Sequence, residues 1–104
     1  MDQDLPFKPE RCFTIYQMTA PRGGHGHLVS RTILFALAGK LRVEVRAKGT
    51  QKVESDFYLL DDPKNGLYLD PEDWHAFEAL SPDAVLLCIA SQPFSKDDYF
   101  YERP

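Results

Sequence analysis

The sequence contains few of the residues that mark special classes of protein. Its 104 residues include only two cysteines, Cys12 and Cys88, which excludes a disulfide-rich secreted fold. Both cysteines fall within predicted strands, and a buried free cysteine packs as a small hydrophobe. We therefore expect two reduced thiols in the core. A disulfide between them is the alternative if the two strands are neighbours.

Long apolar runs and an excess of positive charge are also missing. The longest apolar run, Ala84–Ala90, is far shorter than the about 20 residues that cross a bilayer, so we expect no membrane partner. The net charge is −4, with acids and bases interspersed, which argues against a nucleic-acid partner. The acidic start, Met1–Pro6, lacks the apolar segment of a secretory signal, so we expect a cytoplasmic protein.

A helical period is the third missing feature, and strand signals take its place. Leu41–Ala47 alternates between apolar and polar residues, while Thr32–Ala38 is almost continuously apolar. The predicted strands are Cys12–Met18, Thr32–Ala38, Leu41–Ala47, Val53–Leu60, Leu67–Leu69, His75–Leu80 and Ala84–Ser91. We expect the last two to form a hairpin around Ser81–Asp83. The pattern predicts one all-β domain over residues 1–104, built as a sandwich or small barrel.

Histidine is scarce, with three in the chain, but two of them stand in Arg22-Gly-Gly-His25-Gly-His27. In a strand, residues two apart project from the same face, about 6.6 Å apart along the chain. Glycines such as Gly24 let a ligand approach the backbone closely. An imidazole exchanges a proton near neutral pH, and the fork of Arg22 suits a phosphate or carboxylate. The spacing of the two histidines alone does not decide whether they act in acid–base catalysis, bind a metal or have no function.

The third histidine, His75, follows the single tryptophan, Trp74. A tryptophan at a strand entrance stacks on a base or sugar in some proteins and simply packs in more of them. From the residues alone, we expect Tyr16 and Tyr68 in the core or at its rim.

Two short segments near the end of the chain are interpreted as structural. The acidic pair Asp97-Asp98 is expected to be a solvated segment. The aromatic stretch Tyr99–Tyr101 is expected to pack the end of the chain onto a sheet.

Four blocks of the sequence, in a fixed order, resemble the WxcM-like cupins, a family that includes the dTDP-4-oxo-6-deoxyglucose 3,4-ketoisomerases. The blocks are Arg22–His27, Ile33–Gly39, Gly66–Leu69 with Trp74-His75, and Ala90–Phe94 with Asp97–Tyr99. The resemblance extends from about Pro6 to Tyr99. It implies a cupin-type jelly roll, a homodimer and a dTDP-linked 4-keto-6-deoxyhexose as substrate. It also implies catalysis without a metal or other cofactor, in the making of bacterial deoxysugars and polysaccharides.

The resemblance also implies roles for individual residues. His27 falls on the proton-shuttling base of the family, His25 on its assisting partner, Arg22 on a substrate-binding arginine and Tyr16 on an active-site tyrosine. Further substrate contacts are expected from Gly24, Thr32, Tyr68, Trp74 and His75. One imidazole would carry a proton from C3 to C4 of the sugar through an enediol while hydrogen bonds stabilise the oxyanion.

The sequence departs from the family pattern at three places. Gly26 replaces the usual alanine between the histidines, which we expect to loosen the backbone. Leu28-Val29 replace polar or basic residues, and Thr32 stands where a glutamine or glutamate is common. Two alternatives therefore stay open. One is a weakly active or non-catalytic sugar-binding module. The other is a metal-dependent cupin that uses His25, His27 and His75 as ligands.

Overall fold

The computed structural model describes residues 5–49 and 54–104, which form nine strands and one short 3-10 helix. The strands are β1 (Arg11–Tyr16), β2 (Arg22–His27), β3 (Thr32–Ala38), β4 (Leu41–Arg46), β5 (Asp56–Leu60), β6 (Leu67–Leu69), β7 (Trp74–Ala79), β8 (Val85–Ala90) and β9 (Tyr99–Phe100), and η2 (Lys96–Asp98) is the helix. The predicted strands are confirmed to within a few residues. The predicted start of one of them at Val53 lies outside the described residues. The first strand ends before Met18 because Gln17 has φ of +54°, outside the β region.

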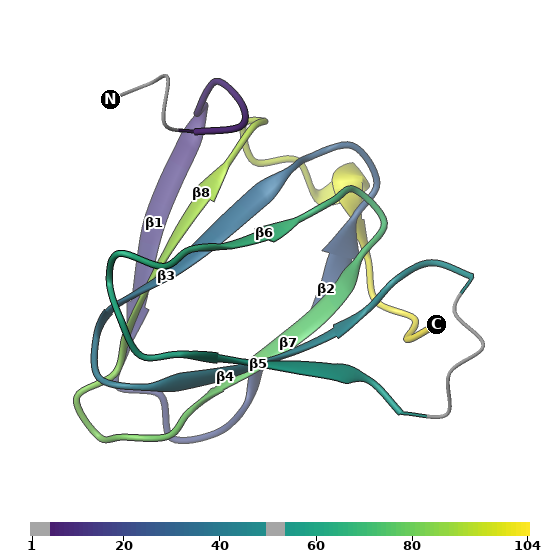
Figure 1. The fold of residues 1–104 in the computed structure, drawn as a ribbon. Coiled ribbons are helices and arrows are strands. Elements are labelled where there is room, and N and C mark those ends of the chain that lie inside the picture. The colour runs from purple at the N-terminus through teal and green to yellow at the C-terminus, as the bar shows by residue number, and fades with distance from the viewer. Residues whose placement is uncertain (1–4, 50–53) are drawn as a thin grey trace.

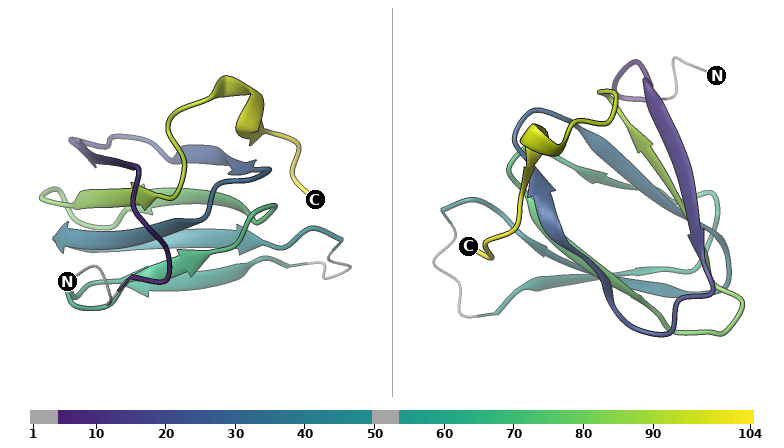
Figure 2. Two further views of the ribbon diagram at one scale, coloured as in Figure 1. Left: turned by 90° about the horizontal axis from the view of Figure 1, so that it is seen from above. Right: turned by 180° about the vertical axis from the view of Figure 1, so that it is seen from behind.

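The strands make two sheets that face each other (Figure 1). One sheet has the order β1-β8-β3-β6 and the other the order β5-β4-β7-β2-β9, and every pairing is antiparallel. The predicted all-β, double-sheet architecture is confirmed. Figure 2 shows the last segment of the chain running beside β2, where the short β9 completes the five-stranded sheet.

The interior is filled by alternate residues of each strand. Leu41 and Val43 of β4 are fully buried and Arg42 between them is exposed, which confirms the predicted alternation at the start of this strand. Leu34 of β3 and Leu86 of β8 pack into the same core from the opposite sheet. This apolar core forms the floor beneath the polar residues described below.

The expected hairpin between the last two long strands is wrong. Strand β7 pairs with β2 and β4, whereas β8 pairs with β1 and β3 in the other sheet. The segment between them therefore crosses from one sheet to the other. Each strand buries an apolar face, Phe77 on β7 and Leu86 on β8, and the two faces meet across the interior. Alternation along a strand shows which face is buried but not which strand lies beside it.

The two cysteines are both free, and they differ in burial. Cys88 is buried as expected, and burial raises the pKa of its thiol to about 12. Cys12 is exposed, which corrects the expectation of a second core thiol. Its neighbour Phe13 pairs with Cys88 and faces inward, so alternation turns Cys12 to the outer face.

Within the described ranges, no helix has the length and apolar character needed to span a bilayer.

Candidate active site

Strand β2 contains a β-bulge where it pairs with β7. Arg22 pairs with Phe77, and three residues later His25 pairs with His75. Two steps along β7 thus correspond to three along β2, and Gly24 is the extra residue. Since Phe77 and His75 share the inner face, Arg22 and His25 both face inward. Regular alternation would place residues three apart on opposite faces.

The bulge depends on glycine. Gly23 and Gly24 have φ values of +88° and +73°, a region that residues with a Cβ rarely adopt. A Cβ on Gly23 would also lie only 3.2 Å from the Cα of Ala76 and from the carbonyl oxygen of His75. The glycine pair before the histidines therefore sets the direction of the neighbouring side chains.

The three histidine rings form one cluster on the inner face. The ring centroid of His25 lies 5.3 Å from that of His27 and 4.8 Å from that of His75, both edge to face. The rings of His27 and His75 are stacked at 6.1 Å. The expected neighbourhood of His25 and His27 is thus present, and the fold adds His75 from the adjacent strand.

The cluster lines a cavity of about 180 Å³ between the sheets. The lining residues are Arg11, Phe13, Ile15, Arg22, Gly23, His25, His27, Leu34, His75, Phe77, Leu86, Cys88 and Tyr99. One wall carries the imidazoles, and the other, from the four-stranded sheet, is apolar except for Arg11. Such a cavity, apolar with a few convergent polar groups, is typical of a small-molecule site.

His27 is held by a carboxylate from the far end of the sequence. Its Nδ1 lies 3.0 Å from Oδ2 of Asp98, and both side chains are close to nine-tenths buried. The other carboxylate oxygen, Oδ1, accepts hydrogen bonds from the backbone N–H groups of Val29, at 2.6 Å, and Ser30, at 3.4 Å. These bonds anchor Asp98 to the loop that follows the histidine.

This contact determines which ring nitrogen of His27 is free. An ionised carboxylate only accepts hydrogen bonds, so Nδ1 of His27 carries the hydrogen that Asp98 receives. In the neutral ring, Nε2 then has the free lone pair. A nitrogen of this kind is the chemical requirement for a general base.

Burial keeps the cluster uncharged near neutral pH. Desolvation lowers the pKa of His27 below its ordinary value of 6.5, and the hydrogen bond and charge of Asp98 partly oppose that shift. Desolvation and the neighbouring His27 lower the pKa of His25. Burial lowers the pKa of His75 to about 3, with smaller effects from the other two rings. These shifts all favour the neutral form of the rings at pH 7.

The arrangement does not favour the metal alternative. In residues 5–49 and 54–104, no group of three or more His, Cys, Asp or Glu side chains is placed to hold a metal ion. Nδ1 of His75 is buried without a hydrogen-bond partner among the described residues.

Tyr99 completes the polar wall. Its ring centroid lies 4.5 Å from that of His27 and 4.8 Å from that of His25. Nη1 of Arg11 donates a hydrogen bond of 3.1 Å to its phenol oxygen. Strand β9 places it there by pairing Tyr99 with His27, which agrees with the expected packing of this stretch on a sheet.

The sequence matches the family described as "FdtA: WxcM-like, C-terminal" over residues 1–104. The chain belongs to this family.

The relatives of this WxcM-like chain include sugar ketoisomerases. The TDP-4-oxo-6-deoxy-alpha-D-glucose-3,4-oxoisomerase of Aneurinibacillus thermoaerophilus is 32% identical over 100 residues, which cover 94% of this chain and 69% of the relative. A solved variant of the 3,4-ketoisomerase QdtA from Thermoanaerobacterium thermosaccharolyticum, in complex with TDP-4-keto-6-deoxyglucose, is 26% identical with a TM-score of 0.88 over 97% of this chain and 72% of that one.

A third relative is the TDP-fucose-3,4-ketoisomerase WlaRA from Campylobacter jejuni. It is 28% identical with a TM-score of 0.85, over 93% of this chain and 70% of that one. The agreement in architecture confirms the fold class expected from the resemblance, a cupin-type barrel of two antiparallel sheets.

Three residues expected at the site of this WxcM-like chain lie elsewhere. Tyr16 is 61% exposed because alternation along β1 turns it outward. Tyr68 likewise projects from the outer face of β6, where its ring lies 6.4 Å from that of Phe7. Trp74 is buried outside the cavity, and its Nε1 donates to the carbonyl oxygen of Tyr101. The interpretation of Trp74 as a packing residue is the one that the contacts support.

Two further expected residues are close to the cavity without lining it. Gly24 acts through the bulge that turns Arg22 inward. Thr32 is buried, 2% exposed, and its Oγ1 has no hydrogen-bond partner among the described residues. It shares the inner face of β3 with Leu34, which does line the cavity.

Gly26, one of the departures from the family pattern, is closely packed against its neighbours. A Cβ there would collide with the ring of Phe100 and would lie 2.7 Å from the carbonyl oxygen of Asp73. The aromatic ring thus occupies the space of the missing methyl group. Leu28 and Val29, the other departure, are both exposed.

The expectation that Asp98 is solvated is also wrong, although Asp97 beside it is exposed as predicted. The two carboxylates are adjacent and of the same residue type. The available signal was the position of Asp98 directly before the aromatic stretch that packs against β2. Arg11 was missed as well, because it reaches the cavity only through the pairing of β1 with β8.

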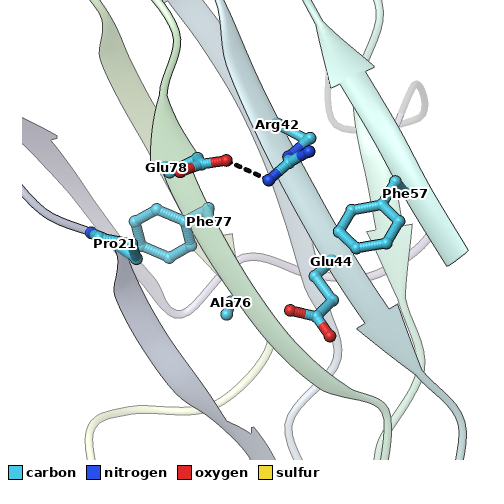
Figure 3. A pocket seen from close by; sticks show the side chains of 7 residues that line it. All are labelled: Pro21, Arg42, Glu44, Phe57, Ala76, Phe77 and Glu78. Atoms are coloured by element: carbon cyan, nitrogen blue, oxygen red, sulfur yellow. Dashed lines mark ion pairs between the residues drawn. The ribbon is translucent and has the colours of Figure 1, made fainter. Parts of the chain in front are cut away.

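A second hollow lies on the outer face of the five-stranded sheet (Figure 3). An ion pair between Arg42 and Glu78 crosses it, and the guanidinium of Arg42 lies over the ring of Phe57. It contains no histidine. The internal cavity is therefore the candidate active site.

Proposed function

We propose that residues 1–104 form one sugar 3,4-ketoisomerase domain that acts on a dTDP-linked 4-keto-6-deoxyhexose in bacterial deoxysugar biosynthesis. The observation that carries the proposal is the Asp98–His27 pair beside the cavity, in a chain whose relatives are named for this reaction. The pair presents a neutral imidazole with Nε2 free to take a proton.

The reaction needs an acid–base group and no net oxidation. Nε2 of His27 removes the proton from C3, and the C–H electron pair forms the C3=C4 double bond as O4 becomes an oxyanion. The same imidazolium then returns the proton to C4 while the carbonyl forms at C3 and the hydroxyl proton of O3 passes to O4. The negative charge of Asp98 stabilises the imidazolium between these two transfers.

Other lining residues would bind and orient the substrate. Arg22 offers a fixed positive charge for the diphosphate, because the bulge turns it inward. His25 bonds its ring N–H to the backbone of Gly23, so its other nitrogen would accept a hydrogen bond from a sugar hydroxyl beside His27. His75 forms the floor of the cluster.

We also propose that the protein is a cytoplasmic homodimer, on the strength of the family resemblance. Sedimentation velocity of the purified protein at micromolar concentration checks the oligomeric state. A dimer mass is expected, and a monomer across the concentration range would contradict it.

The activity is tested by incubating dTDP-4-keto-6-deoxyglucose with the protein in heavy water and following the sugar by NMR. We expect deuterium at the exchanging carbon and accumulation of the 3-keto isomer. His27→Asn should reduce both by at least about 10²-fold, the usual contribution of a positioned acid–base group. A matched urea denaturation curve for His27→Asn shows that the fold is intact.

Three results would overturn the proposal in different ways. An unchanged rate in His27→Asn would remove this residue from the mechanism. Binding of the sugar by calorimetry, without exchange or turnover, would favour a binding module. Stoichiometric Zn, Fe, Ni or Mn needed for turnover would favour the metal-dependent alternative.

A further inference from the structure

A 3,4-ketoisomerisation moves two protons, and His27 accounts for only one of them. One proton passes from C3 to C4, and a second passes from the hydroxyl O3 to the former carbonyl oxygen O4. We propose that Tyr99 carries this second proton and that Arg11 positions it. The inference rests on the proposed function and assigns the half of the reaction that the histidine does not perform.

The position of Tyr99 suits a group that reaches the same sugar carbons as the base. Strand β9 pairs it directly with His27, and its ring lies within 5 Å, centroid to centroid, of both His25 and His27. It lines the cavity. A substrate within reach of Nε2 of His27 is therefore also beside the phenol.

The hydrogen bond from Arg11 leaves the phenol hydrogen free. A guanidinium has only donors, so Nη1 of Arg11 donates and the Tyr99 oxygen accepts, at 3.1 Å. The phenol hydrogen is then available to a sugar oxygen. The guanidinium is itself held, since it lies 4.6 Å from the ring centroid of Phe13 and 5.1 Å from that of Phe94.

The other polar lining groups are less suited to this transfer. Arg11 and Arg22 do not release protons in proteins. The Cys88 thiol has its pKa raised to about 12 by burial, and the buried His75 is difficult to protonate. The N–H of neutral His25 is bonded to the backbone of Gly23, so its other ring nitrogen has no hydrogen to give to O4. Among the described residues that line the cavity, Tyr99 alone carries a hydroxyl, a group that donates and accepts at one atom.

The transfer balances without another reactant. As His27 removes the C3 proton, the phenol O–H bond breaks and its proton passes to O4. The phenolate, beside the guanidinium of Arg11, then takes the proton of O3 as the C3 carbonyl forms. His27 returns its proton to C4, and both residues end in their starting states.

The test separates the carbon step from the oxygen step in Tyr99→Phe. Deuterium entering C3 of the recovered 4-keto sugar reports carbon exchange, and the 3-keto product reports the complete reaction. We expect isomerisation to fall by about 10²-fold or more. The ratio of exchange to isomerisation should rise at least about tenfold, because the remaining base still exchanges the carbon proton. Tyr58→Phe, on the outer strand β5, is the matched control and should change neither rate.

Arg11 is tested as a positioning residue in Arg11→Gln and Arg11→Lys. Arg11→Gln should raise the same ratio, and Arg11→Lys should restore part of the isomerisation. These two Arg11 variants keep the test decisive if Tyr99→Phe does not fold. An unchanged ratio in Tyr99→Phe, or in Arg11→Gln, would overturn the inference while leaving His27-dependent isomerisation intact. An absence of exchange and product in the unmodified protein would instead overturn the proposed function.

Discussion

Asp98 and His27 are 71 residues apart in the sequence, yet Oδ2 of one lies 3.0 Å from Nδ1 of the other. The backbone brings them together. Leu28 N–H donates to the carbonyl oxygen of Asp98 at 2.7 Å, and the adjoining strand β9 pairs with β2. The carboxylate therefore orients the ring from the end of η2, directly before β9. Removal of this one contact should affect catalysis more than folding.

Asp98→Asn should lower kcat/KM by about 10²-fold, since an amide does not stabilise the imidazolium and can favour the wrong tautomer. Asp97→Asn removes the same charge from the neighbouring exposed position and should change kcat/KM by less than about twofold. Steady-state kinetics on the two variants makes the comparison. Equal losses in both would mean that the Asp98–His27 contact has no catalytic role.

The acid limb of the pH–rate profile should lie below pH 6.5. The base must be neutral to act, so kcat/KM falls as the pH drops through the pKa of His27, which burial places below its ordinary 6.5. Asp98 raises this pKa, so Asp98→Asn should move the limb to still lower pH as its maximum falls. Profiles of kcat/KM from pH 4 to 8 measure the acid limb of the unmodified protein and that of Asp98→Asn. A limb at or above 6.5, or a shift upward in the variant, would contradict the assignment of His27.

Gly26→Ala should destabilise the protein by about 1–3 kcal/mol, the usual range for overpacking. Its Cβ would collide with the ring of Phe100, which follows Asp98 and Tyr99 in the chain, so activity should fall as well. Phe100→Leu in the same chain should restore part of the stability. The carbonyl of Asp73, 2.7 Å from the new atom, prevents a complete rescue. Urea denaturation of the single and double variants measures this, and an additive loss would show that the ring is not the obstacle.

Gly23→Ala and its matched control Gly49→Ala test whether the bulge in β2 orients Arg22. Their φ values are +88° and +76°, so each should lose about 1–2 kcal/mol of stability from the backbone alone. Only Gly23 stands next to Arg22, and a Cβ on Gly49 would meet nothing within 4 Å. We expect Gly23→Ala alone to raise KM, by about tenfold, because the guanidinium of Arg22 would be displaced from the diphosphate of the substrate. A similar KM in both variants would show that the bulge does not orient Arg22.

Local pattern was sufficient for the strands and for part of the site. The apolar run Thr32–Ala38 and the short β-forming segment Leu67–Leu69 match the observed bounds of β3 and β6. His25 and His27 share a face because residues two apart in a strand project from the same face. The hairpin prediction failed because strands of opposite sheets carry the same alternation.

The sequence by itself determined the all-β class, the strand positions and the paired imidazoles, since these follow from residue periodicity within one segment. Only the tertiary structure decided what surrounds those imidazoles. Asp98 and Tyr99 come from β9 and its approach, Arg11 from the opposite sheet and His75 from the neighbouring strand. Tyr16 faces away. These positions depend on register, on one bulge and on pairing between distant segments, and no local pattern encodes the partner of a strand.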